Sequence, residues 1–376
     1  MPVLSRADTS VLGRWWWTVD RWTLLAIGAL IGFGYVMMLA ASPAVAERIH
    51  QSRDLFIAKQ VVFLALAGIV VVGVSLLSPR GIRRLALLGC LVALLLTALT
   101  LLVGTEIKGA RRWISLPGMS LQPSEFLKPC FAVVTAWLMS EAQRTRLFPG
   151  RIIALGLFGV IALLLKAQPD MGMLTVILAV FFTQFFVGGL NLALVGLGAG
   201  GMVAAAMGAY TFFPHVRSRV TRFLDPTSGD SYQVNTALEA FGNGGLLGRG
   251  PGEGRVKDVL PDAHADFVFA VMGEEFGMVI CVLVLALFGF IVLRGLLRLL
   301  AEQDLFIVLA ATGLVTSFGL QAFVNMASSL HLIPTKGMTL PFVSYGGSSV
   351  LAVALGIGML LALTRRRTRL ETEAIR

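Results

Sequence analysis

Charged residues are scarce in this chain of 376 residues: Asp, Glu, Lys and Arg make up only 14% of it, whereas hydrophobic residues make up 56%. A soluble domain usually carries about 25% charged residues. No soluble fold of this length could remove so much apolar sequence from water. The composition therefore excludes an ordinary soluble enzyme and predicts a protein whose solvent is lipid.

Cysteine and histidine are also rare. The three cysteines Cys90, Cys130 and Cys281 all lie within apolar runs, which favours small buried residues over a disulfide framework or a metal site. The four histidines are scattered along the chain and lack the spacing of metal ligands. The sequence therefore indicates no metal centre.

The net charge of +10 does not point to nucleic acid, because the arginines form short clusters between apolar runs. This pattern is typical of the cytoplasmic loops of membrane proteins. The polar N-terminal segment is followed by an apolar run that is long enough to span a bilayer. We therefore expect this run to remain as an anchor and not to be cleaved as a signal peptide.

Apolar runs long enough to cross a membrane recur along the chain, a crossing needing roughly 20 residues. The clear candidates are residues 22–41, 55–77, 85–104, 123–140, 190–212, 267–293, 305–330 and 344–364. Residues 152–187 contain two shorter runs, separated by Gln168-Pro169-Asp170, and we interpret them as two crossings. The sequence predicts an all-α polytopic integral membrane protein with about ten transmembrane helices and one long extracytoplasmic loop.

The arginine clusters also predict the orientation of the chain. They place a cytoplasmic N-terminal segment at residues 1–21 and a basic cytoplasmic tail at residues 365–376. The transmembrane domain then comprises residues 22–364, with the long outer loop at residues 213–265. We expect both termini in the cytoplasm.

Ionisable groups within apolar helices are costly and usually functional. Glu125 and Lys128 lie three residues apart in the span at 123–140, so they can pair on one helix face. The pair is either a self-neutralising structural element or part of a cationic lining for an anionic headgroup. Asp170, after Pro169, is expected to cap the next helix, although interrupted spans also flank substrate sites.

The long outer loop contains a glycine-rich segment, 242–254, and ends at Asp266. Such a segment can cradle phosphates, but it lacks the Gly-Lys-Ser/Thr ending of a nucleotide-binding loop. Asp266 either caps the following helix or acts as a partly desolvated general base. Glu274 and Glu275 lie deeper in that helix and need partners. The loop at 334–349, rich in Pro and Gly, is expected to be rigid and either buried in protein or lining a cavity.

Four short segments together resemble the SEDS family (shape, elongation, division and sporulation proteins), over essentially the whole chain. They are Lys-Gly-x-x-Arg-Trp at 108–113, Gln-Pro-Ser-Glu at 122–125, Gln-Pro-Asp-x-Gly at 168–172 and Leu-Pro-x-x-His-x-Asp-Phe at 260–267. Lys336 in Pro-Thr-Lys-Gly, and the segment at 248–254, resemble the division branch (FtsW-like) more than the elongation branch (RodA). Ala265 departs from the family's usual Thr, which puts a hydroxyl contact beside the carboxylate in doubt.

The resemblance implies a peptidoglycan glycosyltransferase that polymerises lipid II into glycan strands during septal cell-wall synthesis. The 4-hydroxyl of one unit would attack the anomeric carbon of the growing strand and displace a lipid diphosphate. Asp266 matches the catalytic Asp of the family. The residues expected to bind substrate are Arg112, Lys128, Lys336, Glu125 and Lys108. Among them, Glu125 would hold Lys128 in place.

The resemblance implies no certain cofactor, although a divalent cation (Mg²⁺ or Mn²⁺) could accompany the diphosphate. The implied partners are lipid II, a class B penicillin-binding protein transpeptidase, other division proteins and the lipid bilayer, with no nucleic acid. The implied location is the plasma (inner) membrane at the division septum. Two alternatives stay open, a lipid II flippase and a non-catalytic division scaffold, and formation of glycan polymer distinguishes them from a polymerase.

Overall fold

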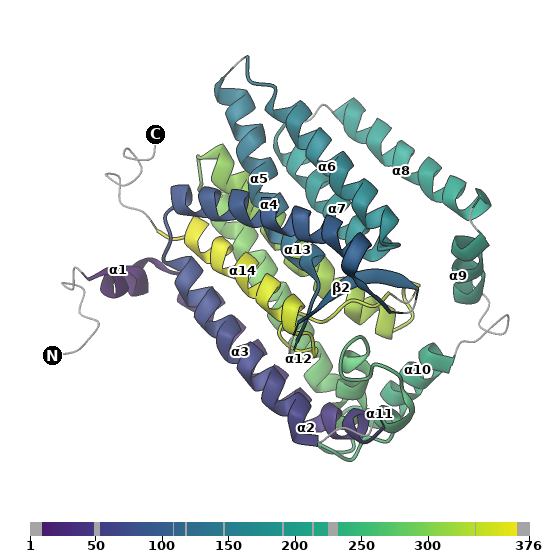
Figure 1. Cartoon of the computed structure of the whole chain (residues 1–376). Helices are drawn as coiled ribbons and strands as arrows, with labels where there is room; N and C mark the ends of the chain where they lie inside the picture. Colours follow the sequence, from purple (N-terminus) through teal and green to yellow (C-terminus); the bar gives the residue numbers. More distant parts are fainter. Residues whose placement is uncertain are drawn as a thin grey trace.

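The molecule is a bundle of long helices with one small β-sheet (Figure 1). The computed structural model describes residues 10–48, 53–107, 109–116, 119–145, 147–189, 192–212, 214–224, 232–334 and 336–366. The first helices are α1 (Val11–Thr18), α2 (Arg21–Arg48), α3 (Arg53–Ser75), α4 (Pro79–Val103), α5 (Pro123–Arg144), α6 (Gly150–Ala167) and α7 (Met171–Val187). The others are α8 (Leu192–Phe212), α9 (Pro214–Leu224), α10 (Tyr232–Gly244), α11 (Val256–Val259), α12 (Val268–Leu299), α13 (Leu305–Ser329) and α14 (Gly347–Leu363).

The predicted helical, polytopic membrane fold is confirmed, and its helix set accommodates about ten crossings. Within the described residues, six helices have the length and apolar composition of a membrane span, namely α2, α3, α4, α6, α12 and α13. The apolar helices α7 and α14 are shorter, and α5 and α8 bring the set to about ten. Residues 152–187 form two helices, α6 and α7, as the interruption at Gln168-Pro169-Asp170 predicts.

Local sequence determines where several helices begin. The side chain of Ser78 accepts a hydrogen bond from the backbone N–H of Gly81, and Pro79 occupies the first turn of α4. The side chain of Asp304 caps α13 in the same way by accepting from the N–H of Phe306, at 2.9 Å. These caps satisfy N–H groups that have no partner within the helix.

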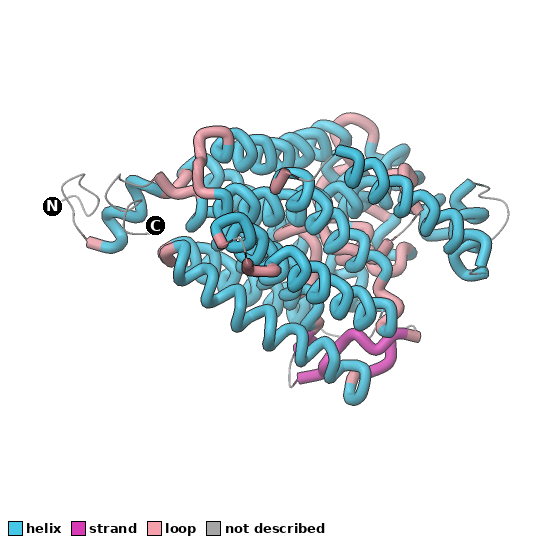
Figure 2. The backbone as a smooth tube through the Cα atoms, turned by 90° about the horizontal axis from the view of Figure 1, so that it is seen from above, coloured by secondary structure: helices cyan, strands magenta, loops and turns pink. Residues whose placement is uncertain are grey.

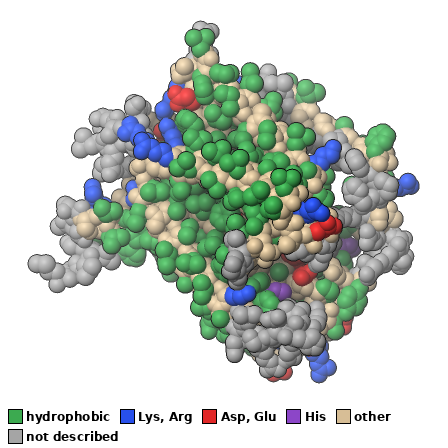
Figure 3. Space-filling model, viewed as in Figure 1, with side chains coloured by type: hydrophobic (Ala, Val, Ile, Leu, Met, Phe, Trp, Pro, Cys, Tyr) green, Lys and Arg blue, Asp and Glu red, His purple; other side chains and the backbone are tan. Residues whose placement is uncertain are grey.

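Helices α5 and α13 form the centre of the bundle. They pack against each other, α14 lies between α5 and α3, and α4 and α7 pack on other sides of this core (Figure 1). Most side chains of α5 and α13 are buried, whereas large apolar side chains of α3, α4, α6 and α12 are exposed. On the face in Figure 3, apolar side chains cover a broad central area, and charged ones lie at the upper left and toward the lower right. This distribution fits helices that face lipid.

The connection between α4 and α5 is a small antiparallel sheet, which the all-α prediction did not include. It consists of β1 (Thr105–Ile107), β2 (Ala110–Leu116) and β3 (Met119–Leu121), in the order β1-β2-β3. Gly109 has φ of +77°, a conformation that glycine adopts without steric cost in the turn between β1 and β2. The sheet lies at the periphery of the molecule, away from α1 (Figure 2).

Helix α12 is interrupted at Gly277, which has φ of 77° and ψ of 178°. The glycine-rich segment 242–254 of the long loop before α12 pairs with this break. The carbonyls of Glu274 and Glu275 accept from the N–H groups of Arg249 (2.9 Å) and Gly250 (3.0 Å). The N–H of Met278 in turn donates to Gly245 (3.0 Å). The predicted span at 267–293 is therefore two helical pieces, of which the first is buried within the protein.

Candidate active site

The carboxylate of Asp266 lies in the turn that leads into α12. The N-cap position of that helix is Phe267, so the capping interpretation of Asp266 does not match the start of the helix. The backbone N–H of Asp266 donates to the carbonyl of Asp262 at 3.0 Å, which holds the turn closed. Asp266 is partly exposed, as a group that must reach a substrate has to be.

Asn325 of α13 ties this turn to the loop that precedes α14. Its Nδ2 donates to the carbonyl oxygens of Asp266 (2.9 Å) and Met338 (2.6 Å). A second link comes from Ser344, whose Oγ donates to the carbonyl of Ala265 at 2.6 Å. Two segments about seventy residues apart in the sequence are thus held together around the carboxylate. Asn325 was not among the predicted site residues, although an amide within an apolar helix is a signal for such a contact.

Arg112 reaches from β2 to the junction between α6 and α7. Its Nε donates to the carbonyl of Gln168 at 3.0 Å, a second nitrogen donates to the carbonyl of Pro169, and Nη1 lies 3.6 Å from Oδ2 of Asp170. Asp170 caps α7, as predicted, by accepting from the N–H of Met173 at 3.2 Å. Burial raises the pKa of the Asp170 carboxyl, and the positive charge of Arg112 opposes that increase.

Lys336 lies over the first turn of α7. Its Nζ is 3.4 Å from Oγ1 of Thr175, and its Cδ would be 3.8 Å from a Cβ atom placed on Gly172. Arg112 binds the residue that caps this same helix. Lys336 also directly precedes Gly337, which lies against the carboxylate of Asp266. The structure therefore brings three of the predicted site residues to one end of the bundle, namely Arg112, Asp266 and Lys336.

Lys128 and Glu125 form the predicted pair inside the protein. The Nζ of Lys128 lies 2.7 Å from Oε2 of Glu125 and donates to Oε1 of Gln321 at 2.5 Å. Only 3% of the Lys128 side chain is exposed. The amide nitrogen of Gln321 donates to the carbonyl of Thr339 at 3.1 Å. The pair is thus linked through Gln321 to Thr339 in the loop before α14. The remaining predicted residue, Lys108, lies outside the described residues.

The two glutamates of α12 find partners in the long loop that precedes this helix. Lys257 lies 2.7 Å from Oε1 of Glu275, whose Oε2 accepts from the N–H of Gly252 at 2.7 Å. Oε2 of Glu274 accepts from the N–H of Val256 at 2.9 Å. The N–H groups of Gly250 and Gly252 are thus engaged within the protein, which argues against a phosphate cradle there. Nothing in the local sequence pattern indicates Lys257 as this partner.

Among the described residues, metal-binding side chains do not converge at this site. Among the residues that the structure describes, no group of three or more His, Cys, Asp or Glu could hold a metal ion. The donor set around Asp266 therefore does not fit a cation held by the protein itself, whose octahedral oxygen coordination needs several ligands.

Sequence comparison assigns this chain to a known family. The family model for FtsW, RodA and SpoVE, described as a cell cycle protein, matches residues 21–369. The chain belongs to the FtsW/RodA/SpoVE family. A relative from Caulobacter vibrioides (strain NA1000 / CB15N), a probable peptidoglycan glycosyltransferase FtsW, is 43% identical over 365 residues, covering 96% of this chain and 93% of the relative. Another with the same description, from Trichlorobacter lovleyi, is 38% identical and covers 92% and 93%.

Solved structures of the FtsW/RodA/SpoVE family share the fold. One comes from work on how a peptidoglycan synthase complex coordinates polymerization and crosslinking. It matches with a TM-score of 0.76 and 30% identity, over 92% of this chain and 97% of that chain. The rod shape determining protein RodA of Thermus thermophilus matches with a TM-score of 0.68 and 29% identity, over 93% and 97%. The family assignment thus rests on sequence and fold together.

Proposed function

We propose that this protein is a peptidoglycan glycosyltransferase that polymerises lipid II into glycan strands during septal cell-wall synthesis. The names of the FtsW relatives support this activity. The observation that carries it is Asp266, a partly exposed residue whose backbone carbonyl accepts from Asn325 of α13, which also donates to Met338 in the loop before α14. Arg112 and Lys336 lie at the same end of the bundle and supply positive charge.

In the proposed reaction, Asp266 is the general base. It removes the proton of the 4-hydroxyl of one lipid II unit while that oxygen bonds to the anomeric carbon of the growing strand. The bond from that carbon to the lipid diphosphate breaks, and the diphosphate leaves with the electron pair. A positioned base contributes about 10²- to 10⁴-fold in rate.

Positive side chains at this end would stabilise the leaving diphosphate, because its charge grows as the bond breaks. We assign this role to Arg112 and Lys336, with Lys108 as a further contact. Lys128, held by Glu125, would contribute indirectly, because it is linked through Gln321 to Thr339 in the loop that carries Lys336. A divalent cation such as Mg²⁺ or Mn²⁺ would arrive with the diphosphate, and no step proposed here depends on it.

The orientation that fits this function has Asp266 on the outer side of the plasma (inner) membrane and both termini in the cytoplasm. The clusters Arg294–Arg298 and Arg365–Arg366 support it, because they lie together at the other end of the bundle. We further propose location at the division septum and a class B penicillin-binding protein as the transpeptidase partner. The similarity to a peptidoglycan synthase complex supports that partner.

The decisive experiment compares wild-type protein with Asp266→Asn, each with its transpeptidase partner, in a lipid II polymerisation assay. Asn keeps the shape of the side chain but removes its basicity, so the rate should fall about 10²- to 10⁴-fold. Asp262→Asn is the matched control, because it changes a carboxylate in the same turn. Its φ of 54° suits Asn.

Two results would contradict the proposal. Polymer made by a folded Asp266→Asn variant at more than roughly a tenth of the wild-type rate would exclude the general-base role. A wild-type protein that moves lipid II across vesicles yet forms no polymer with its partner would instead favour the flippase alternative.

A further inference from the structure

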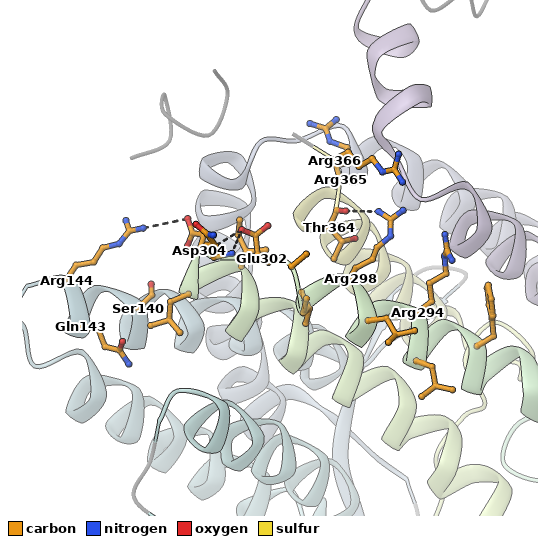
Figure 4. A pocket seen from close by; sticks show the side chains of 18 residues that line it. Ser140, Gln143, Arg144, Arg294, Arg298, Glu302, Asp304, Thr364, Arg365 and Arg366 are labelled. Carbon is orange, nitrogen blue, oxygen red and sulfur yellow. Dashed lines mark hydrogen bonds and ion pairs between the residues drawn. The ribbon is translucent and has the colours of Figure 1, made fainter. Parts of the chain in front are cut away.

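A large cavity lies at the end of the bundle opposite the candidate active site. Its volume is about 1250 Å³, and it is bounded by the C-terminal ends of α5, α12 and α14 and by the start of α13 (Figure 4). The proposed reaction uses none of its residues.

Arginines dominate the polar part of the cavity wall. The five that line it are Arg144, Arg294, Arg298, Arg365 and Arg366. They come from three elements and surround one space, as Figure 4 shows for the labelled side chains. Glu302 and Asp304 are the carboxylates of the wall. Arginine forms bidentate hydrogen bonds that match a phosphate group.

The nearby carboxylates do not neutralise this charge. Oδ2 of Asp20 lies 2.6 Å from Arg294 and 2.9 Å from Arg298, so one carboxylate serves two guanidinium groups. Asp304 lies 3.6 Å from Arg144. Among the described residues, five arginines and two carboxylates, Glu302 and Asp304, line the cavity, and Asp20 lies beside Arg294 and Arg298. The described lining therefore carries more positive than negative groups.

Apolar side chains of α12 also line the cavity, next to its arginines, and continue onto the outside of the bundle. Phe290, Leu293 and Leu297 line the cavity and follow one another at about one turn of α12. Their exposed fractions are 39%, 62% and 64%, as expected for the surface of a membrane span that faces lipid. A ligand in this cavity would therefore meet both guanidinium groups and side chains that extend to the lipid-facing surface.

We propose that this cavity binds the headgroup of an anionic phospholipid, with its phosphate on the arginines and its acyl chains along Leu293 and Leu297. Basic pockets between transmembrane helices are established sites for anionic headgroups. A free phosphate ion would use the arginines but gain nothing from the apolar side chains of α12. A bound lipid would link α5 and α12 with the segment that follows α14.

The test measures binding of short-chain phosphatidylglycerol to the purified full chain in a neutral detergent. Phosphatidylcholine with the same chains and inorganic phosphate are measured in parallel. The variant R365Q/R366Q removes two cavity arginines, while the backbone bond from Arg366 to Thr18 remains available. The control R80Q/R84Q removes the same charge from exposed positions at the start of α4, which do not line the cavity.

Phosphatidylglycerol should bind more tightly than phosphatidylcholine or phosphate. Its affinity should fall roughly tenfold or more in R365Q/R366Q, given the contribution of each arginine near a membrane surface, and should stay unchanged in R80Q/R84Q. Equal loss in both variants, or in neither, would overturn the proposal, as would equal binding of phosphatidylcholine or phosphate. If R365Q/R366Q does not fold, Arg144→Gln on the wall formed by α5 is judged by the same criteria.

Discussion

Gly337 lies directly against the carboxylate of Asp266: a Cβ atom on Gly337 would be 2.8 Å from Oδ2. This distance is shorter than normal contacts allow, so any side chain at position 337 must displace the carboxylate or the loop. Lys336, the preceding residue, reaches over the start of α7 at the same time. Because Gly337 has no side chain, the loop that carries Lys336 can pack directly against the carboxylate of Asp266, the proposed base.

Replacing Gly337 with Ala should therefore reduce polymerisation strongly, because displacement of a reacting group by about 1 Å can cost on the order of 10²-fold in rate. Initial rates of glycan synthesis with the transpeptidase partner measure the effect. Gly172→Ala is the matched control, since its Cβ would meet only ordinary contacts at 3.8 Å. A Gly337→Ala variant as fast as Gly172→Ala would show that Asp266 needs no such clearance.

Replacing Lys128 with Ala should destabilise the protein and slow lipid II turnover. The substitution leaves Glu125 in the interior without its cation, which typically costs about 3–5 kcal/mol. Thermal unfolding in detergent measures the loss. The double variant Glu125→Gln/Lys128→Met should recover most of the stability, because it removes both charges. Turnover should remain low in this double variant, and a normal rate would show that the pair is only structural.

Replacing Lys257 with Ala should loosen the glycine-rich segment from α12. Glu275 would lose its cation at a buried position, and the expected loss of stability is again about 3–5 kcal/mol. Limited proteolysis of the outer loop and thermal unfolding both report it. The exposed neighbour Asp258 gives the control, since Asp258→Asn should change stability by less than about 0.5 kcal/mol. Similar protease resistance of both variants would contradict the role of Lys257.

The orientation can be tested by labelling single cysteines with a maleimide that does not cross membranes. The native Cys90, Cys130 and Cys281 are buried, so an introduced cysteine should report alone. Leu247→Cys in the outer loop should react in intact cells, whereas Leu300→Cys, at the basic end, should react only in opened cells. Both positions are 82% exposed. The reverse pattern would invert the proposed topology. Ser228, also within the long outer loop, lies outside the described residues.

The amino-acid sequence alone determined the features that depend on local physics. The length of apolar runs predicted about ten membrane helices, and Pro169 predicted the break between α6 and α7. Spacing along one helix predicted the Glu125–Lys128 pair. These predictions succeed because helix length and helix periodicity depend on residues close together in the chain. Resemblance to a family then selected Asp266 and the basic residues.

Only the tertiary structure decided what surrounds those residues. The links from Asn325 to Asp266 and Met338, and from Arg112 to Asp170, join segments far apart in the sequence. The interruption of α12 at Gly277 depends on hydrogen bonds to the long loop before this helix. The apolar sequence of α12 contains no sign of these bonds and therefore predicted one continuous span. Each such contact forms only when the helices are packed together. The residue pattern of one segment therefore cannot predict which distant residue it will contact.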